Sequence, residues 1–176
     1  MPKVLVISDS HGMKEELMQV KERHENETDA MIHCGDSELS TDSEELQGFH
    51  YAKGNCDFEP DMEEEQVVDV KGVRFFVAHG HLLQVKQTLM PIFYRSEEVG
   101  ADVACFGHSH MIGAEKVGDK LVMNPGSSRL PRDREEPTYA IIHWVEGSKE
   151  MTLAYYHIDG TKLDDLEIEV DLGSRN

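Results

Sequence analysis

The sequence of 176 residues is poor in cysteine, in basic residues and in long hydrophobic runs, and each shortage excludes a class of protein. The three cysteines, Cys34, Cys56 and Cys105, have no paired short spacing and favour reduced thiols over a disulfide framework. The longest apolar runs are about six residues, far below the ~20 that cross a bilayer, and the chain starts on a strand pattern without a signal-peptide core. We therefore expect a cytoplasmic protein with no membrane partner.

Basic residues are few: 17 Lys and Arg stand against 35 Asp and Glu, for a formal charge of −18. Such a surface repels polyanions, which argues against extended nucleic-acid binding. A small phosphorylated substrate is still compatible, because bound divalent cations would reverse the sign of the field inside a pocket.

The length and a hydrophobic content of 39% suffice for one core and are too small for two domains of ordinary size. We expect a single domain that spans residues 1–176.

The first part of the chain predicts a β-α-β unit. The run from Lys3 to Ser8 is short and rich in Val and Ile, which is typical of a strand buried on both faces. After Gly12 the apolar residues recur at helical spacing, and a short strand follows from Ala30 to His33. Such a unit pairs its strands in parallel and directs ligands to the loops at their carboxyl ends.

Hairpin patterns dominate the later part of the chain. The segment from Val85 to Val99 is helical but contains Pro91, which predicts either two helices or one that starts with Pro91 in its first turn. Parallel units followed by hairpins predict an α/β fold with two packed mixed sheets and helices outside, a four-layer αββα sandwich. The other expected elements are a short helix that begins near residues 40–42, hairpins over 66–78 and 114–123, strands over 139–145 and 151–157, and an edge strand over 166–171.

Five polar loops, each behind an apolar run, carry Asp, Asn or His. A single histidine pair of this kind is more often structural than a metal site. Because the arrangement occurs five times, we expect the loops to meet at one site. The loops contain Asp9-Ser10-His11, Gly35-Asp36, Gly54-Asn55, His79-Gly80-His81 and Gly107-His108-Ser109-His110.

These side chains offer imidazole nitrogens and carboxylate or carboxamide oxygens, which suit Mn, Fe, Zn, Co or Ni better than Ca or Mg. Seven ligands are too many for one catalytic ion. With one shared carboxylate they divide into two sets of four. The predicted ligands are Asp9, His11, Asp36, Asn55, His79, His108 and His110.

In this order the loops resemble the signature of the calcineurin-like metallophosphoesterase superfamily: Asp-x-His, Gly-Asp, Gly-Asn, a later His and a final Gly-His-x-His. The match extends from Lys3 to Ser128. The Gly-Asn-Cys-Asp and Asn-Pro-Gly-Ser loops and the short length are most similar to the small YfcE-type phosphodiesterase group. The resemblance implies the αββα sandwich and two divalent ions that share one carboxylate. One ion would be held by Asp9, His11, Asp36 and His110, and the other by Asp36, Asn55, His79 and His108.

Two ions about 3.5–4 Å apart lower the pKa of a bridging water and clamp the attacking and leaving oxygens during displacement at phosphorus. The resemblance therefore implies a phosphodiesterase that hydrolyses a small phosphodiester by attack of that bridging hydroxide. The predicted catalytic residues are Asp36, Asn55 and His81, and manganese is the first-choice metal, ahead of nickel, cobalt, iron and zinc. His81 either faces the substrate or hydrogen-bonds a ligand.

Two alternatives stay open. The same site suits a phosphomonoesterase, and the same fold occurs in non-catalytic binding scaffolds such as the retromer subunit. The ligand set of those scaffolds is typically eroded, whereas every position is filled here. The sequence leaves the natural substrate, the metal and the oligomeric state undecided, a homo-oligomer included.

One residue departs from the family pattern. Many members have histidine after Gly-Asn, where it is thought to help protonate the leaving group, and this chain has Cys56. A neutral thiol with a pKa of about 8.5 is a poor substitute for an imidazole acid. We therefore expect phosphodiesters or activated leaving groups to be preferred over alkyl monoesters. The next residue, Asp57, is expected to orient a neighbouring ligand.

Two further features have two interpretations each. The Asn124-Pro125-Gly126-Ser127 loop either supports the pocket or forms a plain tight turn. The arginines Arg129, Arg132 and Arg134 either contact a substrate phosphate or belong to a solvated loop or a subunit contact. His33 is expected to be structural, and Cys34 a small buried hydrophobe.

Overall fold

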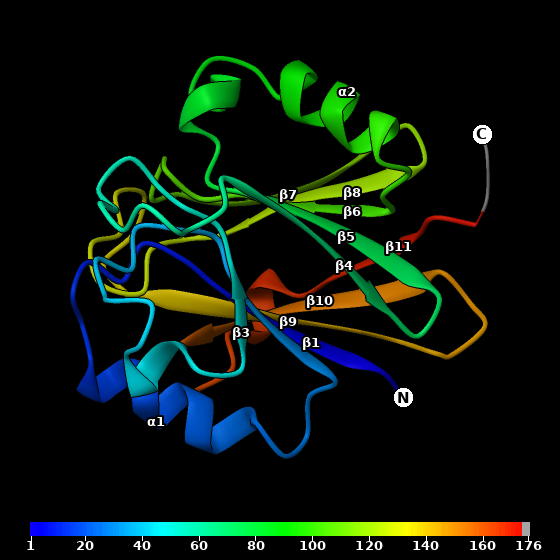
Figure 1. Ribbon diagram of the computed structural model, residues 1–176. Helices are drawn as coiled ribbons and strands as arrows, with labels where there is room; N and C mark the ends of the chain where they lie inside the picture. Colours follow the sequence, from blue (N-terminus) through cyan, green and yellow to red (C-terminus); the bar gives the residue numbers. More distant parts are fainter. Residues whose placement is uncertain (174–176) are drawn as a thin grey trace.

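The computed structural model describes residues 1–173 and contains two β-sheets packed face to face, with α1 and α2 on the two outer sides (Figure 1). The first sheet has the strand order β11-β10-β9-β1-β2-β3, and the second has the order β4-β5-β6-β8-β7. The predicted four-layer αββα sandwich is confirmed. The first sheet comprises β1 (Lys3–Ile7), β2 (Ala30–His33), β3 (Phe49–Tyr51), β9 (Thr138–Trp144), β10 (Glu150–His157) and β11 (Ile168–Asp171), and the second comprises β4 (Glu65–Val70), β5 (Val73–Ala78), β6 (Val103–Cys105), β7 (Ile112–Val117) and β8 (Lys120–Pro125).

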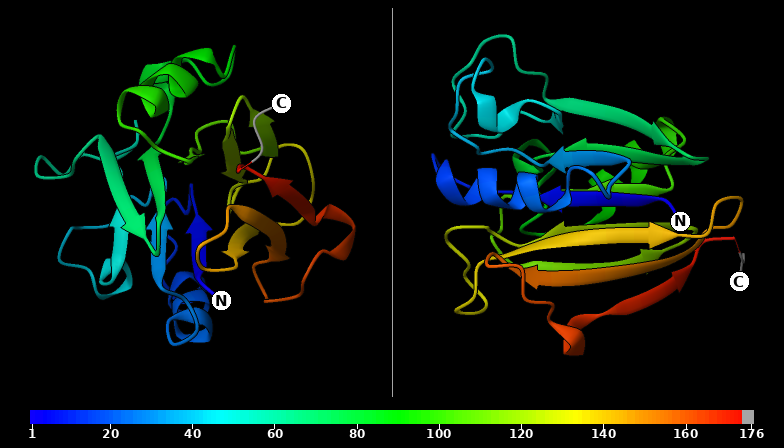
Figure 2. Two further views of the ribbon diagram at one scale, coloured as in Figure 1. Left: turned by 90° about the vertical axis from the view of Figure 1, so that its right-hand side faces the viewer. Right: turned by 90° about the horizontal axis from the view of Figure 1, so that it is seen from below.

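Both sheets are mixed. Strand β1 pairs with β2 in parallel and with β9 antiparallel, and β6 pairs in parallel with both β5 and β8. The carboxyl ends of β1, β2, β5 and β6 therefore point the same way, and their loops gather at the end of the molecule away from both termini (Figure 1). The left panel of Figure 2 looks onto the opposite end, where the N- and C-termini lie.

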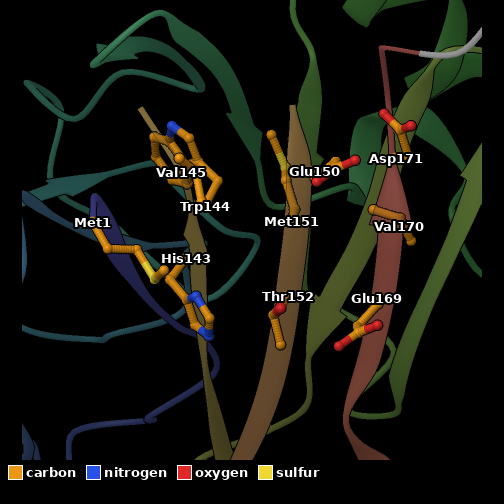
Figure 3. A pocket seen from close by; sticks show the side chains of 10 residues that line it. All are labelled: Met1, His143, Trp144, Val145, Glu150, Met151, Thr152, Glu169, Val170 and Asp171. Carbon is orange, nitrogen blue, oxygen red and sulfur yellow. The ribbon is translucent and has the colours of Figure 1, made fainter. Parts of the chain in front are cut away.

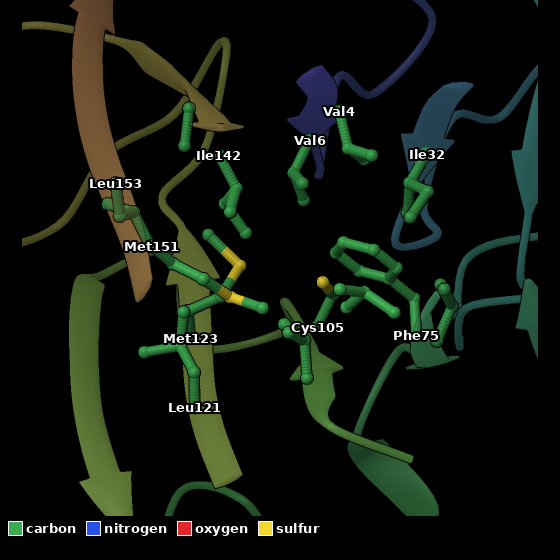
Figure 4. Close-up of a cluster of buried hydrophobic side chains, with 14 of the residues drawn as sticks. Val4, Val6, Ile32, Phe75, Cys105, Leu121, Met123, Ile142, Met151 and Leu153 are labelled. Atoms are coloured by element: carbon green, nitrogen blue, oxygen red, sulfur yellow. The ribbon is translucent and has the colours of Figure 1, made fainter. Parts of the chain in front are cut away.

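The alternation of side chains along β1 shows why its sequence is apolar throughout. Val4 and Val6 enter the core between the sheets, whereas Leu5 and Ile7 pack on the α1 side, and all four are fully buried. Figure 4 shows the first pair beside side chains of the opposite sheet such as Phe75. Each such side chain contributes roughly 1.5–3 kcal/mol through its burial, so β1 is a rigid base for the loop that follows it.

The helices cover the outer faces. Helix α1 (Glu15–His24) buries Leu17 and Val20 against the first sheet, and α2 (Met90–Glu98) buries Ile92 against the second. Pro91 stands in the first turn of α2, where its missing N–H costs no helical hydrogen bond, so the second of the two interpretations of residues 85–99 is confirmed. Three 3₁₀ segments complete the fold: η1 (Glu44–Leu46), η2 (His81–Leu83) and η3 (Asp164–Leu166).

The prediction of a short helix that begins near residues 40–42 is wrong. Ser40 and Asp42 form a local turn in which the Asp42 N–H lies 3.4 Å from the Ser40 hydroxyl, and only the 3₁₀ turn η1 follows. Short polar side chains that bond nearby backbone groups compete with helix formation, which explains the difference. The expected edge strand is confirmed over Ile168–Asp171, where it pairs antiparallel with β10. Within residues 1–173, no helix is long and apolar enough to cross a membrane.

Candidate metal centre

Backbone hydrogen bonds join the polar loops at the carboxyl ends of the strands. The Asp9 N–H donates to the Gly35 carbonyl at 3.0 Å, and the Gly107 N–H donates to the His79 carbonyl at 3.0 Å. The first of these contacts links the β1 and β2 loops, and the second links the β5 and β6 loops. Four of the five predicted loops are thus joined in two pairs by backbone hydrogen bonds alone.

Asp9 lies at the centre of this cluster and is fully buried. Its Oδ2 accepts hydrogen bonds from the Ser8 hydroxyl at 2.6 Å and from the His108 N–H at 3.1 Å. Its Oδ1 faces the other way, 3.2 Å from His110 Nε2 and 3.7 Å from His79 Nε2. One oxygen therefore anchors the carboxylate, and the other is directed at the imidazoles.

Backbone carbonyls fix the tautomers of two histidines. His79 Nδ1 donates to the Cys34 carbonyl at 2.9 Å, and His110 Nδ1 donates to the Leu130 carbonyl at 2.8 Å. Because a carbonyl only accepts, the proton of each neutral ring stands on Nδ1 and the lone pair on Nε2. Both lone pairs point to the side of Asp9, which is the orientation a metal ligand needs.

His11 repeats this arrangement with a side-chain carboxylate. Its Nδ1 lies 2.6 Å from Glu38 Oε1, and its Nε2 lies 3.2 Å from His110 Nε2. Two Nε2 lone pairs at this separation repel each other unless a positive ion lies near both. Glu38 was not among the sequence-predicted residues, and its place two residues after Asp36 carries no recognisable signal.

Two buried polar atoms without hydrogen-bond partners in the part of the chain that the structure describes indicate that the site suits a cation. Asp9 Oδ1 and His79 Nε2 are buried and have no hydrogen-bond partner within the described chain. Leaving a buried polar atom unpaired costs about 1–3 kcal/mol, so such atoms need an explanation. Oxygen and imidazole donors around these atoms suit a divalent transition metal. Three groups have ligand atoms within 4.8 Å of one another: Asp9, His11 and His110; Asp9, Asp36 and His79; and His11, Asp36 and Cys56.

Asp36 connects these groups. Its Oδ2 lies 3.1 Å from His79 Nε2, and its Oδ1 accepts the Cys56 N–H at 2.8 Å. A Cβ on Gly54 would collide with Asp36 Oδ1, which explains why glycine precedes Asn55 in this loop. Asp36 belongs to two of the three groups, as Asp9 does, and its role as the shared carboxylate stays a prediction.

Asp57 holds the Asp36 loop in place, as the sequence analysis expected. Its buried carboxylate accepts the N–H groups of Asp36 at 2.8 Å, of Gly54 at 2.8 Å and of Glu38 at 2.9 Å. One side chain thus positions two of the predicted ligand loops.

The electrostatics favour bound positive charge. Burial alone would raise the pKa of Asp9, but the adjacent His110 and His79 imidazoles outweigh it and lower that pKa. Burial would likewise raise the pKa of Asp36, but the His79 imidazole, whose Nε2 lies 3.1 Å from Asp36 Oδ2, outweighs it and lowers that pKa. Both carboxylates are therefore ionised at neutral pH.

His79, His81 and His108 form a second group of imidazoles. The ring centroids of His79 and His108 are 5.1 Å apart, and those of His79 and His81 are 5.5 Å apart. Burial, the charge of His79 and that of Lys86 lower the pKa of His108 to about 4. Burial and His79 also lower the pKa of His81, whose Nδ1 is buried without a partner in the described chain. Both rings are neutral at pH 7, the form that binds metals.

Asn55 is the predicted ligand that lies farthest out. Its side chain is exposed, and its amide nitrogen lies 3.6 Å from Cys56 Sγ rather than against the imidazoles. Its role as a ligand stays a prediction. Burial and the charge of Asp36 raise the pKa of Cys56 to about 11, so the thiol is neutral, as expected.

The backbone of the ligand loops is strained. Non-glycine residues rarely adopt a positive φ, and each such residue costs roughly 1–3 kcal/mol. Five of the seven predicted ligands do so: Asp9 (54°), His11 (42°), Asp36 (57°), His108 (71°) and His110 (60°).

The Asn-Pro-Gly-Ser loop supports the pocket. The Ser127 hydroxyl donates to the Asp9 carbonyl at 2.8 Å, and Asn124 Nδ2 donates to Ser109 Oγ at 3.0 Å. The loop is also a tight turn, closed by the hydrogen bond from the Gly126 N–H to Asn124 Oδ1 at 2.9 Å. Both interpretations of this loop therefore hold.

The three arginines do not act as one cluster. Arg129 Nη1 donates to the His11 carbonyl at the rim of the site. Arg134 pairs with Glu136 at 3.1 Å, and Arg132 lines a neighbouring cavity. Only Arg129 and Arg132 lie beside predicted ligands.

The calcineurin-like phosphoesterase superfamily domain matches residues 2–147 of this chain. The chain belongs to this superfamily. It is 48% identical over 169 residues to the probable metallophosphoesterase YsnB of Bacillus subtilis, a match that covers 96% of this chain and 99% of that protein. It is also 30% identical over 98 residues to the phosphodiesterase YfcE of Escherichia coli, which covers 51% of this chain and 50% of that protein.

A solved metallophosphoesterase-like structure agrees with the fold. The crystal structure of a predicted phosphoesterase from Streptococcus pneumoniae superposes with a TM-score of 0.92 at 30% identity and covers 97% of both chains. The predicted superfamily, and within it the small YsnB- and YfcE-type group, are confirmed. The superfamily and the donor set together establish a candidate site for divalent metals.

Another cavity lies at the opposite end of the first sheet. It has a volume of about 470 Å³ and lies between the end of β9 and the strands β10 and β11 (Figure 3). Trp144 and the carboxylates of Glu150, Glu169 and Asp171 are among its lining residues. No residue predicted as a ligand or catalytic group lines it.

Proposed function

We propose that this superfamily member is a metal-dependent phosphodiesterase that hydrolyses a small phosphodiester at two divalent ions. The observation that carries the proposal is the pair of buried, unpartnered atoms Asp9 Oδ1 and His79 Nε2 among imidazoles whose Nδ1 atoms are already engaged. The names of the relatives, a metallophosphoesterase and a phosphodiesterase, support the same reaction class.

Bound ions would supply a water of lowered pKa and would neutralise charge on the phosphate oxygens, with manganese as the first-choice metal. The residues that would hold them are Asp9, His11, Asp36, Asn55, His79, His108 and His110.

The chain's own residues orient these ligands and restrict proton transfer. The carbonyls of Cys34 and Leu130 set the imidazole tautomers, and Asp57 fixes the Asp36 loop. His81, half-buried and neutral beside His79, is the proposed proton-handling group, together with Asp36 and Asn55 as predicted catalytic residues.

Cys56 supports a preference for diesters. A thiol with a pKa of about 11 does not protonate an alkoxide leaving group effectively at neutral pH. Phosphodiesters with good leaving groups need no such acid, whereas alkyl monoesters do. Faster turnover of an alkyl monoester than of a diester would contradict this preference and favour the phosphomonoesterase alternative.

The deciding experiment follows hydrolysis of bis-p-nitrophenyl phosphate after chelation and again after addition of Mn²⁺ or Ni²⁺. We expect activity to disappear and to return with the metal, and to be absent in Asp36→Asn. The exposed Asp165→Asn is the matched control and keeps full activity. Activity that is indifferent to chelation, or that survives in Asp36→Asn, contradicts the proposal.

A non-catalytic scaffold is the second candidate, because large apolar side chains are exposed beside the ligand loops. Phe58 is 87% exposed, Leu82 61% and Leu130 52%. Metal binding without hydrolysis of either substrate type would favour this candidate. A cytoplasmic location and a single domain over residues 1–176 stay predictions.

A further inference from the structure

A cavity of about 390 Å³ lies beside the loop that carries the predicted ligands His108 and His110. Ser109, which stands between the predicted ligands His108 and His110, lines this cavity, and so does Met111. Arg132 is tied to the same loop, since its N–H donates to the His110 carbonyl at 3.1 Å. A substrate held at the metal centre would therefore lie next to this cavity.

Two cations line the cavity: Lys86 and Arg132. Of the residues that the structure describes, neither forms an ion pair with a carboxylate. The nearest acidic residue in sequence, Asp133, is engaged by the Ile112 N–H at 3.1 Å. Other cations of this acidic chain have partners, as in the ion pairs Arg74–Asp69, Arg95–Glu65 and Lys149–Asp102.

The remaining lining residues suit an anion on a short organic linker. The Ser109 hydroxyl accepts hydrogen bonds from Asn124 Nδ2 at 3.0 Å and from the Met111 N–H at 3.3 Å, so its own proton is available to a ligand. Val85 and Phe106 add an apolar wall. No carboxylate or imidazole is among the described residues that line this cavity, which excludes a further metal site.

We propose that this cavity binds a second phosphate of the substrate, so that the preferred substrate is a phosphodiester with a phosphate group on one of its two ester arms. Guanidinium and ammonium groups are the side chains that recognise phosphate, the first as a two-pronged donor and the second as a point charge. The proposal rests on the proposed phosphodiesterase function and adds the substrate class.

The test compares two esters that share the p-nitrophenyl leaving group and differ in the end of the other arm, which is a phosphate in phosphoethyl p-nitrophenyl phosphate and a methoxy group in methoxyethyl p-nitrophenyl phosphate. We expect the protein with Mn²⁺ to hydrolyse the phosphoethyl ester with a kcat/KM at least about tenfold higher, because charged hydrogen bonds are worth one to two factors of ten. The double variant Lys86→Gln/Arg132→Gln should lose this preference and hydrolyse the two esters with equal kcat/KM.

Lys71→Gln is the matched control, because Lys71 is exposed in the β4–β5 turn at the other end of the strands, and it should keep the preference. Equal kcat/KM for the two esters, or a preference that survives in the double variant, overturns the proposal.

Failure of the proposed function gives a different result, since neither ester is then hydrolysed. In that case calorimetric binding of the two esters to the protein with Mn²⁺ tests the cavity. Tighter binding of the phosphoethyl ester by the wild type but not by the double variant supports it, and equal binding overturns it.

Discussion

The two ends of the sandwich differ in what their polar groups do. At the end with both termini, Glu150, Glu169 and Asp171 line a cavity of about 470 Å³, and Trp144 Nε1 is buried nearby without a partner among residues 1–173. At the other end, carboxylates and imidazoles converge until Asp9 Oδ1 lies 3.2 Å from His110 Nε2. The candidate site is therefore identified by the short distances between its donor atoms and not by the volume of a cavity.

Backbone strain differs in the same way. At the terminal end the β9–β10 turn adopts a positive φ at Gly147 (87°), where a glycine accepts it without steric cost. In the ligand loops the same conformation falls on Asp9, Asp36 and His110. A strained backbone conformation persists only where the surrounding structure enforces it. Here it directs the side chains of these residues toward the common centre.

The largest difference between the two ends is expected for a substitution of Asp9. Asp9→Asn keeps the shape of the side chain but removes the charge that faces His79 and His110. The value of kcat/KM for bis-p-nitrophenyl phosphate should therefore fall by more than about 100-fold, which is the largest loss expected for a residue that only supports a metal ligand. Glu169→Gln at the opposite cavity is the control and should stay within about twofold. Comparable losses in both variants would show that the two ends do not differ in function.

A pH dependence of folding should also belong to the ligand end. His33 is fully buried, and burial lowers its pKa from 6.5 to about 4. Between these values the unfolded chain binds a proton that the folded chain does not, so stability falls as the pH drops from 6.5 to 4, by about 3 kcal/mol. Above pH 6.5 the contribution is fully present.

Urea unfolding of the wild type and His33→Gln across this range measures the effect, which should shrink in the variant. His143→Gln, on β9 near the termini, is the control. If His143→Gln rather than His33→Gln flattens the pH profile, the assignment to His33 is wrong.

Metal should stabilise the fold through the ligand end. A cation at 100 times its dissociation constant adds about 2.7 kcal/mol to the free energy of unfolding, which for a chain of this size corresponds to a rise of about 5–10 °C in Tm. Thermal unfolding with Mn²⁺ and with chelator measures this, and the rise should vanish in Asp9→Asn. A rise that persists in that variant would place the metal elsewhere.

The smallest effect is expected at the opposite cavity. Trp144→Phe removes the unpartnered N–H together with part of the ring that packs on Phe75, and the two contributions offset each other. The free energy of unfolding should change by less than about 1 kcal/mol, with metal-dependent hydrolysis unaltered. Loss of hydrolysis in Trp144→Phe would instead show that the opposite cavity influences activity at the ligand end.

Much of the fold could be predicted because its signals are local. The apolar run of β1, the spacing of Leu17 and Val20, and Pro91 at the start of α2 each specify an element through nearby residues. The helix expected to begin near residues 40–42 does not form for an equally local reason, since the Ser40 hydroxyl accepts a hydrogen bond from the Asp42 N–H.

Asp57 could be predicted as a support of the site, but the groups that orient the histidines could not. His79 and His110 are oriented by the carbonyls of Cys34 and Leu130, and every residue has a carbonyl, so no letter of the sequence marks these two. Glu38 reaches His11 through a loop with a positive φ of 55° that only the folded contacts enforce. The exposure of Asn55 is likewise a product of the loop's final conformation.

The sequence by itself determined the order of the strands' apolar runs and the identity of the Asp, Asn and His residues that end them, because both are written in local composition and spacing. Only the tertiary structure decided which atom of each side chain faces the centre, and which cations, 46 positions apart at Lys86 and Arg132, share a cavity beside it. These arrangements depend on contacts between segments remote in sequence, and such contacts exist only once the two sheets have packed.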